Sequence, residues 1–231
     1  MTARPIETTE IGADLRHVRS WVFDLDDTLY PPEKQVLRLV ADRIGQFMIR
    51  ATGLPPDEAR ALQKRYLLDH GAALGGLMQD YTVDPHAFLA EVHDVPLDAL
   101  EPSEGLRAGL KRLIGPRYVF TNGSQRHGER VLQKLGVDDL FDGLFALEHA
   151  ELRPKPHPRT FERMLDRFAL EPRDAAFFED TERNLDHAKA LGMTTVLVGP
   201  HALDSVVHFV DHRAAALPPF LATAVLAGDP I

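Results

Sequence analysis

The segment 21–30, with the sequence Trp-Val-Phe-Asp-Leu-Asp-Asp-Thr-Leu-Tyr, constrains the fold of this chain more than any other. Its first three residues are aromatic or β-branched, which is typical of a strand covered on both faces. The apolar run ends at Asp24 and Asp26. Because unpaired carboxylates are costly to bury, acids at the end of such a strand indicate a metal ion or an electrophile between them. The alternative is that Asp26 and Asp27 only cap a turn into a helix.

Further segments of the chain are predicted to be strands of the same parallel sheet, at residues 117–122, 143–148, 175–180 and 194–199. Helices with ordinary start and stop signals are predicted between them, at residues 125–135, 159–168 and 182–191. Strands that alternate with helices of this length predict an α/β fold with a doubly wound parallel sheet.

Polar residues lie at or just beyond the carboxyl ends of these strands. In open sheets of this kind, ligands bind beyond the carboxyl ends of the strands. We therefore expect one site that contains Asp24, Asp26, Thr121, Asn122, Lys155, Glu179 and Asp180.

These residues stand in motifs that resemble, in order, the four motifs of the haloacid dehalogenase superfamily of aspartate-nucleophile phosphatases. The sequence Asp-Leu-Asp-Asp-Thr matches the first motif, Thr121 the second, Lys155 the third, and Glu179-Asp180 with Asn184 the fourth. The resemblance spans residues 20–200, with an insertion between the first and second motifs. It implies a Rossmann-like core and a phosphatase that forms an aspartyl-phosphate.

The chemistry can also be argued from the residues. A phosphate monoester resists attack because its phosphorus centre is anionic, so a site must neutralise charge and align the reacting oxygens. Lys155 would supply a fixed positive charge, and Thr121, Asn122 and the amides near Gly123 would bind phosphoryl oxygens. Asp24 would be the nucleophile and Asp26 the general acid and base.

A cation is expected beside these groups, because Mg²⁺ prefers a few carboxylate ligands plus waters and substrate oxygens. We expect it to be bound by Asp24, Asp26, Glu179 and Asp180. Many relatives place a second aspartate where this chain has Asn184. Glu179 would replace that aspartate, directly or through water, and the alternative is that Glu179 is only a salt-bridged acid.

Asp26 also separates this chain from relatives with other chemistry. By the resemblance, dehalogenases and the phosphonatase branch lack an acid two residues after the nucleophile, and a halide leaving group needs no proton. The presence of Asp26 therefore favours phosphate ester hydrolysis or transfer over cleavage of a carbon–halogen or carbon–phosphorus bond.

Residues 31–103 contain no convincing strand and are expected to be helical. Apolar residues recur at helical spacing over residues 36–48 and 59–67, and residues 86–92 are a further candidate helix. A helical insertion at this point resembles the small cap domain of the superfamily, which covers the mouth of the site and chooses the substrate. We expect a core domain of residues 1–30 and 104–231, a cap domain of residues 31–103, and hinges between them that admit substrate and exclude water.

Within the expected cap, residues 66–77 read Tyr-Leu-Leu-Asp-His-Gly-Ala-Ala-Leu-Gly-Gly-Leu and precede Tyr-Thr-Val-Asp at residues 81–84. This stretch resembles the pyrimidine 5′-nucleotidase branch, which implies a pyrimidine nucleoside 5′-monophosphate as substrate. Gly71 would permit close approach of a flat ligand, and His70 is the best candidate for a ligand contact in the cap. The alternatives are that the glycines let two helices pack and that His70 is a bystander.

The composition agrees with a cytoplasmic enzyme that binds a small phosphate ester. Hydrophobic residues make up 44% of the chain, yet no apolar run approaches the length of a membrane span, and residues 1–19 lack the apolar centre of a signal peptide. The chain has no cysteine, which excludes disulfides and thiol catalysis. The net charge of −9 argues against a nucleic-acid polymer as partner. We expect a monomer or a homodimer.

Alternatives from other classes remain open at this point. A sugar-phosphate phosphatase or a phosphomutase would use the same motifs, and a non-catalytic binding protein on this scaffold is the third possibility. Toward the C-terminus, residues 206–210 are a candidate edge strand, and the run 214–220 is expected to dock on the core or to serve a dimer.

Overall fold

The computed structural model describes residues 12–229. Residues 1–11 and 230–231 lie outside the described part. The first of these ranges belongs to the segment 1–19, in which no signal peptide is expected. Parallel strands form one sheet in the order β3-β2-β1-β4-β5-β6. The strands are β1 (Ser20–Phe23), β2 (Arg117–Phe120), β3 (Gly143–Phe145), β4 (Ala175–Glu179), β5 (Thr194–Val198) and β6 (His212–Ala214). The predicted doubly wound α/β fold is confirmed.

The winding of the chain reverses at β1. This strand pairs with β2 on one side and with β4 on the other, so that Trp21 lies opposite both Arg117 and Ala176. The chain runs outward from β1 to β3 and then returns to the far side of β1 as β4. At such a reversal a crevice opens beyond the carboxyl ends of the strands, and ligands bind there. Asp24 is the first residue after β1.

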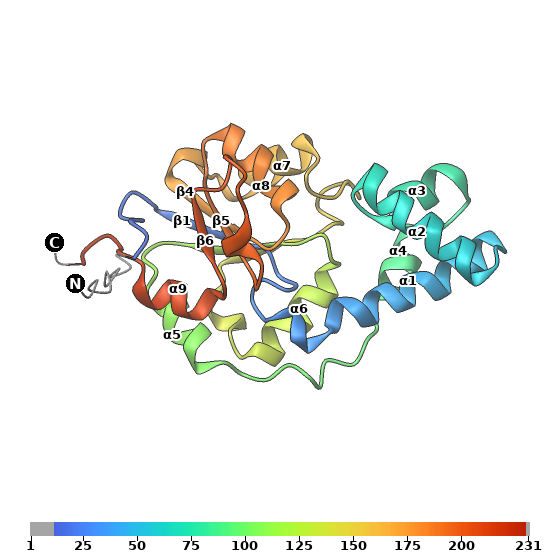
Figure 1. Ribbon diagram of the computed structural model, residues 1–231, viewed down its shortest axis with the longest axis horizontal. Coiled ribbons are helices and arrows are strands. Elements are labelled where there is room, and N and C mark those ends of the chain that lie inside the picture. The colour runs from blue at the N-terminus through green and yellow to red at the C-terminus, as the bar shows by residue number, and fades with distance from the viewer. Residues whose placement is uncertain (1–11, 230–231) are drawn as a thin grey trace, which may run out of the picture.

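Helices cover both faces of the sheet (Figure 1). The core helices are α5 (Glu104–Arg112), α6 (Gln125–Leu135), α7 (Pro158–Phe168), α8 (Glu182–Leu191) and α9 (Leu217–Thr223). Alternate residues of a strand point to opposite faces. In β1, Trp21 and Phe23 therefore pack in one buried cluster with α5, α6 and α9, whereas Val22 packs in a second cluster with α7 and α8.

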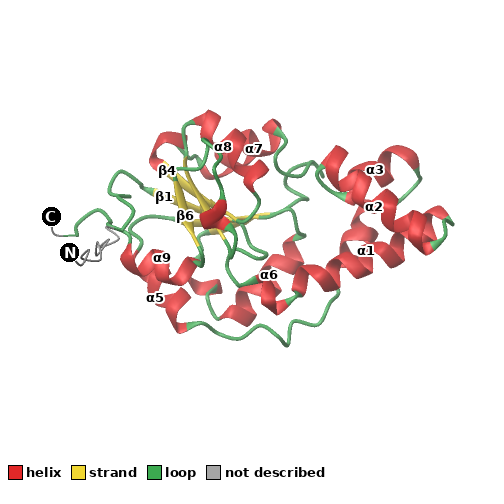
Figure 2. Ribbon diagram, viewed as in Figure 1, coloured by secondary structure: helices red, strands yellow, loops and turns green. Residues whose placement is uncertain are grey.

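A helical lobe lies between β1 and α5 in the sequence and to one side of the core in Figure 2. Its helices are α1 (Val36–Thr52), α2 (Pro56–His70), α3 (Ala73–Asp80) and α4 (Pro85–Val92). They share a hydrophobic cluster that includes Met48, Tyr66 and Phe88, and the core adds Leu147 to it. We call these helices the cap. The predicted domain boundaries at residues 31 and 103 stay a prediction.

The C-terminal region differs in part from the expectation. The predicted edge strand at residues 206–210 is wrong, because this segment is a loop and the edge strand is β6. The Arg213 guanidinium donates hydrogen bonds to the carbonyls of Ser205, Val207 and Val210, which a strand ladder would otherwise use. The run 214–220 leads into α9, which docks on the core.

None of the helices in residues 12–229 is both long and apolar enough to cross a membrane.

Two cap glycines give a matched test of helix packing. A methyl group on buried Gly76 of α3 would lie 2.2 Å from ring atoms of buried Tyr66, whereas one on Gly45 of α1 would meet only the end of the Gln63 side chain at 3.3 Å. We expect Gly76→Ala to lower the free energy of unfolding by about 1–3 kcal/mol through overpacking. Gly45→Ala should raise it, by up to about 1 kcal/mol, because alanine is the better helix former. Urea unfolding measures both, and equal effects would contradict the close α2–α3 contact.

Candidate active site

The carboxyl ends of neighbouring strands bring the predicted site residues together. The amide of Asp24 donates to the carbonyl of Phe178 in β4 over 2.8 Å, which holds the chain after β1 against its neighbour. The amide of Thr121, the residue after β2, donates to the carbonyl of Phe145 in β3 over 2.9 Å. Backbone hydrogen bonds therefore hold the first and second motifs at the carboxyl ends of the strands.

Lys155 connects the acid that follows β1 to the acid that ends β4. Its Nζ donates to Asp24 Oδ1 at 2.6 Å, to the Phe120 carbonyl at 2.8 Å and to Glu179 Oε1 at 2.9 Å, which uses all of its donors. Burial alone would lower the pKa of this lysine, but Asp24 and Glu179 outweigh burial and raise it. Lys155 is thus a fixed positive charge beside Asp24.

The acids in the crevice outnumber this lysine. Carboxylate oxygens of Asp24, Glu179 and Asp180 lie within 4.8 Å of one another. Burial and repulsion by Glu179 raise the pKa of Asp24 to about 7 in spite of Lys155. Burial, followed by repulsion from Glu179 and Asp24, raises the pKa of Asp180 to about 10. A close set of carboxylate oxygens fits a hard divalent cation such as Mg²⁺.

Glu179 and Asn184 are bonded to each other within this group. Burial works to raise the pKa of Glu179, but Lys155 and the hydrogen bonds from Asp180 and the Thr181 amide together outweigh it, so that the pKa lies below the usual value. The Asn184 Nδ2 donates to Glu179 Oε1 at 2.5 Å, and the Thr181 amide donates to Glu179 Oε2 at 2.8 Å. Asn184, which stands where many relatives have an aspartate, here orients the glutamate.

Asp26 is held apart from the other acids, and its carboxylate is not in the group that the structure offers to a cation. Its Oδ1 accepts from Tyr30 Oη at 2.5 Å and lies 2.8 Å from His127 Nε2. Burial works to raise the pKa of Asp26, but His127 and the two hydrogen bonds outweigh it and place the pKa below the usual value. The role of Asp26 as a metal ligand stays a prediction.

The loop after β2 supports Lys155 from the other side. The Asn122 Oδ1 accepts from the Lys155 amide at 2.7 Å, and Asn122 Nδ2 donates to the Lys155 carbonyl at 3.3 Å. The Thr121 hydroxyl accepts from the Gly123 amide at 2.8 Å. The Asn122 side chain thus holds the Lys155 backbone, and its contact with phosphate stays a prediction.

The cap meets the core at Gly71, the residue that ends α2. Its φ of 78° is in the left-handed region, and a methyl group there would lie 3.0 Å from the Lys155 carbonyl. The Arg183 guanidinium of α8 also donates to the Leu67 carbonyl at 3.2 Å. The His70 ring packs edge-on against Tyr66 at 5.8 Å between centroids. Gly71 therefore packs against the loop that contains Lys155. The substrate contacts expected of His70 and Gly71 stay predictions.

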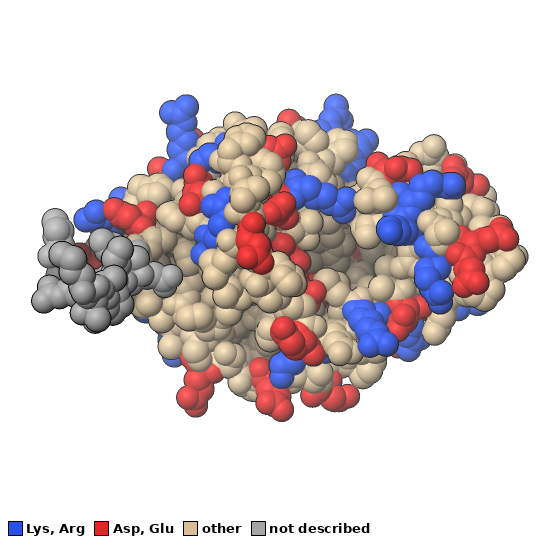
Figure 3. Space-filling view, in the orientation of Figure 1, with Lys and Arg blue, Asp and Glu red and all other residues tan. Residues whose placement is uncertain are grey.

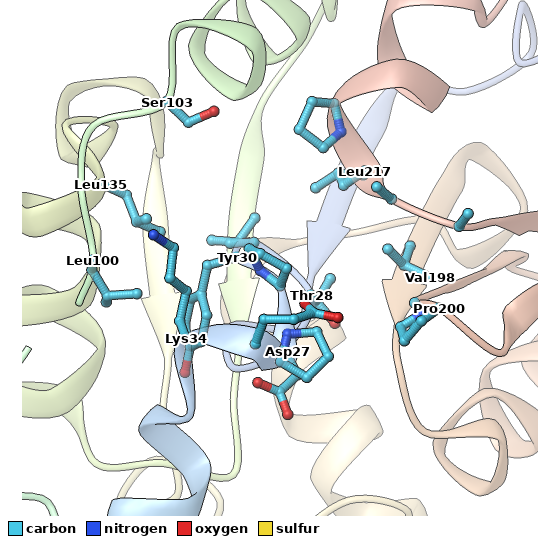
Figure 4. Close-up of a pocket in the computed structure, with 18 of the residues that line it drawn as sticks. Asp27, Thr28, Tyr30, Lys34, Leu100, Ser103, Leu135, Val198, Pro200 and Leu217 are labelled. Atoms are coloured by element: carbon cyan, nitrogen blue, oxygen red, sulfur yellow. The ribbon is translucent and has the colours of Figure 1, made fainter.

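A hollow lies between the cap and the core in Figure 3. A separate cavity of about 540 Å³ lies at the two chain connections between them (Figure 4). It is lined by Tyr30, Lys34, Leu100, Ser103, Val198 and Leu217, among others, and by none of the acids bonded to Lys155. Free space at both connections is compatible with hinge motion there, which stays a prediction.

Sequence reasoning missed the partners of Asp26. Tyr30 lies in the first motif segment, and His127 lies in the first turn of α6, whose start is capped by Ser124. The position of His127 could have indicated its contact with the site, because the amino end of the helix after the second motif must face the crevice. His93, whose ring stacks on His127, lies some thirty residues earlier, and nothing in the sequence spacing indicates it.

Known proteins are similar to this chain over most of its length. Phosphate metabolism protein 8 of Saccharomyces cerevisiae is 30% identical over 197 residues, which cover 76% of this chain but only 60% of the yeast protein. Fructose-1-phosphate phosphatase YqaB of Escherichia coli is 29% identical over 190 residues, covering 76% of this chain and 93% of that protein. Glyceraldehyde 3-phosphate phosphatase of Pyrococcus furiosus is 28% identical over 198 residues, covering 79% and 81%.

Solved structures share the fold. A HAD phosphatase from Thermococcus onnurineus matches with a TM-score of 0.59 at 20% identity, covering 86% of this chain and 94% of that one. The L-2-haloacid dehalogenase from Xanthobacter autotrophicus matches with a TM-score of 0.56 at 18% identity, covering 89% and 97%. A family model of haloacid dehalogenase-like hydrolases matches residues 18–192. Because that match runs through β1, the Lys155 loop and the acids at the end of β4, the chain belongs to the haloacid dehalogenase-like hydrolase family.

Proposed function

We propose that this hydrolase cleaves small phosphate monoesters through an aspartyl-phosphate on Asp24. The observation that carries the proposal is the different environment of two neighbouring carboxylates. Asp24 is bonded to Lys155, whereas Asp26 is bonded to Tyr30 and His127. A nucleophile and an acid–base group are thus held separately in one crevice. A halide leaving group would need only the first of them.

In the first step, a carboxylate oxygen of Asp24 attacks phosphorus while the bond from phosphorus to the leaving oxygen breaks, and Asp26 gives its proton to that oxygen. In the second step, Asp26 takes a proton from water as the water attacks phosphorus. The bond to Asp24 then breaks and releases inorganic phosphate. The charge of a bound phosphate favours the protonated form of Asp26 in the complex, because like charge disfavours the carboxylate.

The remaining residues bind and orient the phosphoryl group. Lys155 offers positive charge beside Asp24, and the Thr121 hydroxyl and the amides near Gly123 offer hydrogen bonds. Asp24, Glu179 and Asp180 would hold Mg²⁺, which when bound supplies charge neutralisation at the phosphoryl oxygens.

The nucleophile is tested by Asp24→Asn. The amide keeps the shape of the side chain but cannot attack phosphorus, so we expect release of inorganic phosphate from 4-nitrophenyl phosphate to fall by about 10³-fold or more, as when other enzyme nucleophiles are removed. Circular dichroism and thermal melting should show an intact fold. A rate near that of the parent protein would remove Asp24 from this role.

The metal is tested by a measurement that does not need turnover. Because Mg²⁺ binds the folded state, it should raise the Tm in proportion to RT ln(1 + [Mg²⁺]/Kd), equivalent to about 2.7 kcal/mol at 100 times Kd. Asp180→Asn should reduce this shift, whereas Asp186→Asn, an exposed acid of α8, should leave it unchanged. Chelation should also stop phosphate release, and full activity in excess chelator would refute the metal assignment.

For the substrate we propose a pyrimidine nucleoside 5′-monophosphate, on the strength of the cap sequence at residues 66–77. The His70–Gly71 turn supports this, because it lies against the Lys155 loop and so at the edge of the phosphate site. A small sugar phosphate is the second candidate, since two of the relatives are named as fructose-1-phosphate and glyceraldehyde 3-phosphate phosphatases.

The two candidates are separated by kcat/KM for UMP, CMP, fructose 1-phosphate and glyceraldehyde 3-phosphate. If His70 contacts the nucleoside, His70→Ala should lower kcat/KM for UMP and CMP by about 10-fold, the size of one lost contact, and leave 4-nitrophenyl phosphate unchanged. Asp69→Ala, at an exposed neighbour, is the control. A substitution at Gly71 would be uninformative, because it would also disturb the Lys155 loop. Preference for sugar phosphates would end the nucleotidase assignment.

A further inference from the structure

Asp26 is fixed by two hydrogen-bond donors that act on the same oxygen. Tyr30 Oη donates to Oδ1 at 2.5 Å, and His127 Nε2 lies 2.8 Å from the same atom. An ionised carboxylate only accepts hydrogen bonds, so Nε2 is the donor and carries the ring proton. The terminal torsion of an aspartate is intrinsically broad. Two donors on Oδ1 therefore favour one orientation of the carboxylate.

The other oxygen of Asp26, Oδ2, lies on the side of Gly123 and Thr121, in the loop proposed to bind the phosphoryl group. A methyl group built on Gly123 would lie 3.1 Å from His127 Cδ2, 3.2 Å from Thr121 Oγ1 and 3.7 Å from Asp26 Oδ2. The free oxygen of Asp26 and the hydroxyl of the second motif thus border the same small space, which Gly123 leaves open. Proton transfer to a leaving oxygen in that space must use Oδ2, because Oδ1 is bonded to Tyr30 and His127.

The His127 ring is itself held by the end of the cap. The ring of His93, the residue after α4, stacks on His127 at 4.8 Å between centroids and 26° between planes. His93 Nδ1 donates to the Leu89 carbonyl at 3.0 Å, which fixes its ring. Arg130, one turn after His127 on α6, donates to the carbonyls of His93 and Val95 at 3.0 and 2.8 Å. The last residues of the cap are thereby fastened to the helix that carries His127.

We propose that His127 and Tyr30 are positioning residues that hold Asp26 with Oδ2 toward the leaving oxygen, and that His93 places the His127 ring for this task. The proposal rests on the proposed function, because it assigns a proton-transfer atom in that reaction. It goes beyond the motifs of the family, since α6 and the end of α4 supply two of the residues. It also makes the orientation of the Asp26 carboxylate depend on the contact between α6 and the residues that follow α4.

The test uses leaving groups that differ in their need for a proton. In His127→Leu, rapid-quench measurement should show formation of the phosphoenzyme from an alkyl phosphate slowed by about 10²-fold, as expected for a misplaced catalytic group. Formation from 2,4-dinitrophenyl phosphate should change by less than about 3-fold, because that leaving group needs no general acid. Hydrolysis of the phosphoenzyme, which needs Asp26 as base, should also slow. In His127→Gln, the side-chain amide can donate to Oδ1, so we expect much of the alkyl phosphate rate to return.

Tyr30→Phe tests the second donor, because it removes the hydroxyl and keeps the buried ring. It should show the same dependence on leaving group as His127→Leu. His187→Leu is the control for loss of a partly buried histidine. His187 lies on α8, and its ring packs against that of Phe161 at 5.1 Å between centroids. This substitution should alter neither rate. Equal losses with both substrates in His127→Leu, or no recovery in His127→Gln, would overturn the positioning role.

A crystallographic arm separates this inference from the proposed function. The Asp26 carboxylate should keep its orientation in His127→Gln and turn away in the double variant of His127→Leu with Tyr30→Phe. An unchanged carboxylate in the double variant would overturn the inference, even if the parent protein hydrolyses phosphate esters. A parent protein without phosphatase activity would refute the proposed function, while the crystal structures would still decide whether the two donors orient Asp26.

Discussion

The buried ammonium group of Lys155 is the interaction on which the arrangement of the site depends. A lysine that is 1% exposed is tolerable only when its charge is paired and its donors are used. Here the partners are Asp24 after β1, the Phe120 carbonyl of β2 and Glu179 of β4. The three strands at the centre of the sheet are thus tied at their carboxyl ends by one side chain. Removing the lysine charge would leave the buried carboxylates of Asp24 and Glu179 without their positive partner, which is strongly destabilising.

The same electrostatic constraint explains why the acids are divided into two sets. Asp24, Glu179 and Asp180 lie close enough to share a cation, and burial together with their mutual repulsion raises the pKa values of Asp24 and Asp180. Asp26 faces His127 and Tyr30, which favour its charged form. Two carboxylates that are two residues apart therefore have different environments, as a nucleophile and an acid–base group require. The turn after β1 separates them.

The expectations from the sequence were most accurate for the core. Continuous apolar strands and capped helices are local patterns, and the bounds of α6 and α8 agree with the predicted ranges. The edge strand was misplaced, because the side chain of Arg213 takes the carbonyls of Val207 and Val210, which a strand at residues 206–210 would have used. The sequence did not single out α3 either, since Gly75 and Gly76 are poor helix formers. The structure places Gly76 directly against the Tyr66 ring.

By itself the sequence determined the fold class and the order of the motifs, because hydrophobic period and motif spacing are properties of short segments. Only the tertiary structure decided how each group is held. Asn122 supports the Lys155 backbone, Asn184 orients Glu179, and His127 with His93 fixes Asp26. Three of these contacts join residues more than thirty positions apart in the sequence: Asn122 and Lys155, His127 and Asp26, and His93 and His127. The fold brings these residues together where the winding of the sheet reverses, and no local pattern in the sequence predicts such long-range contacts.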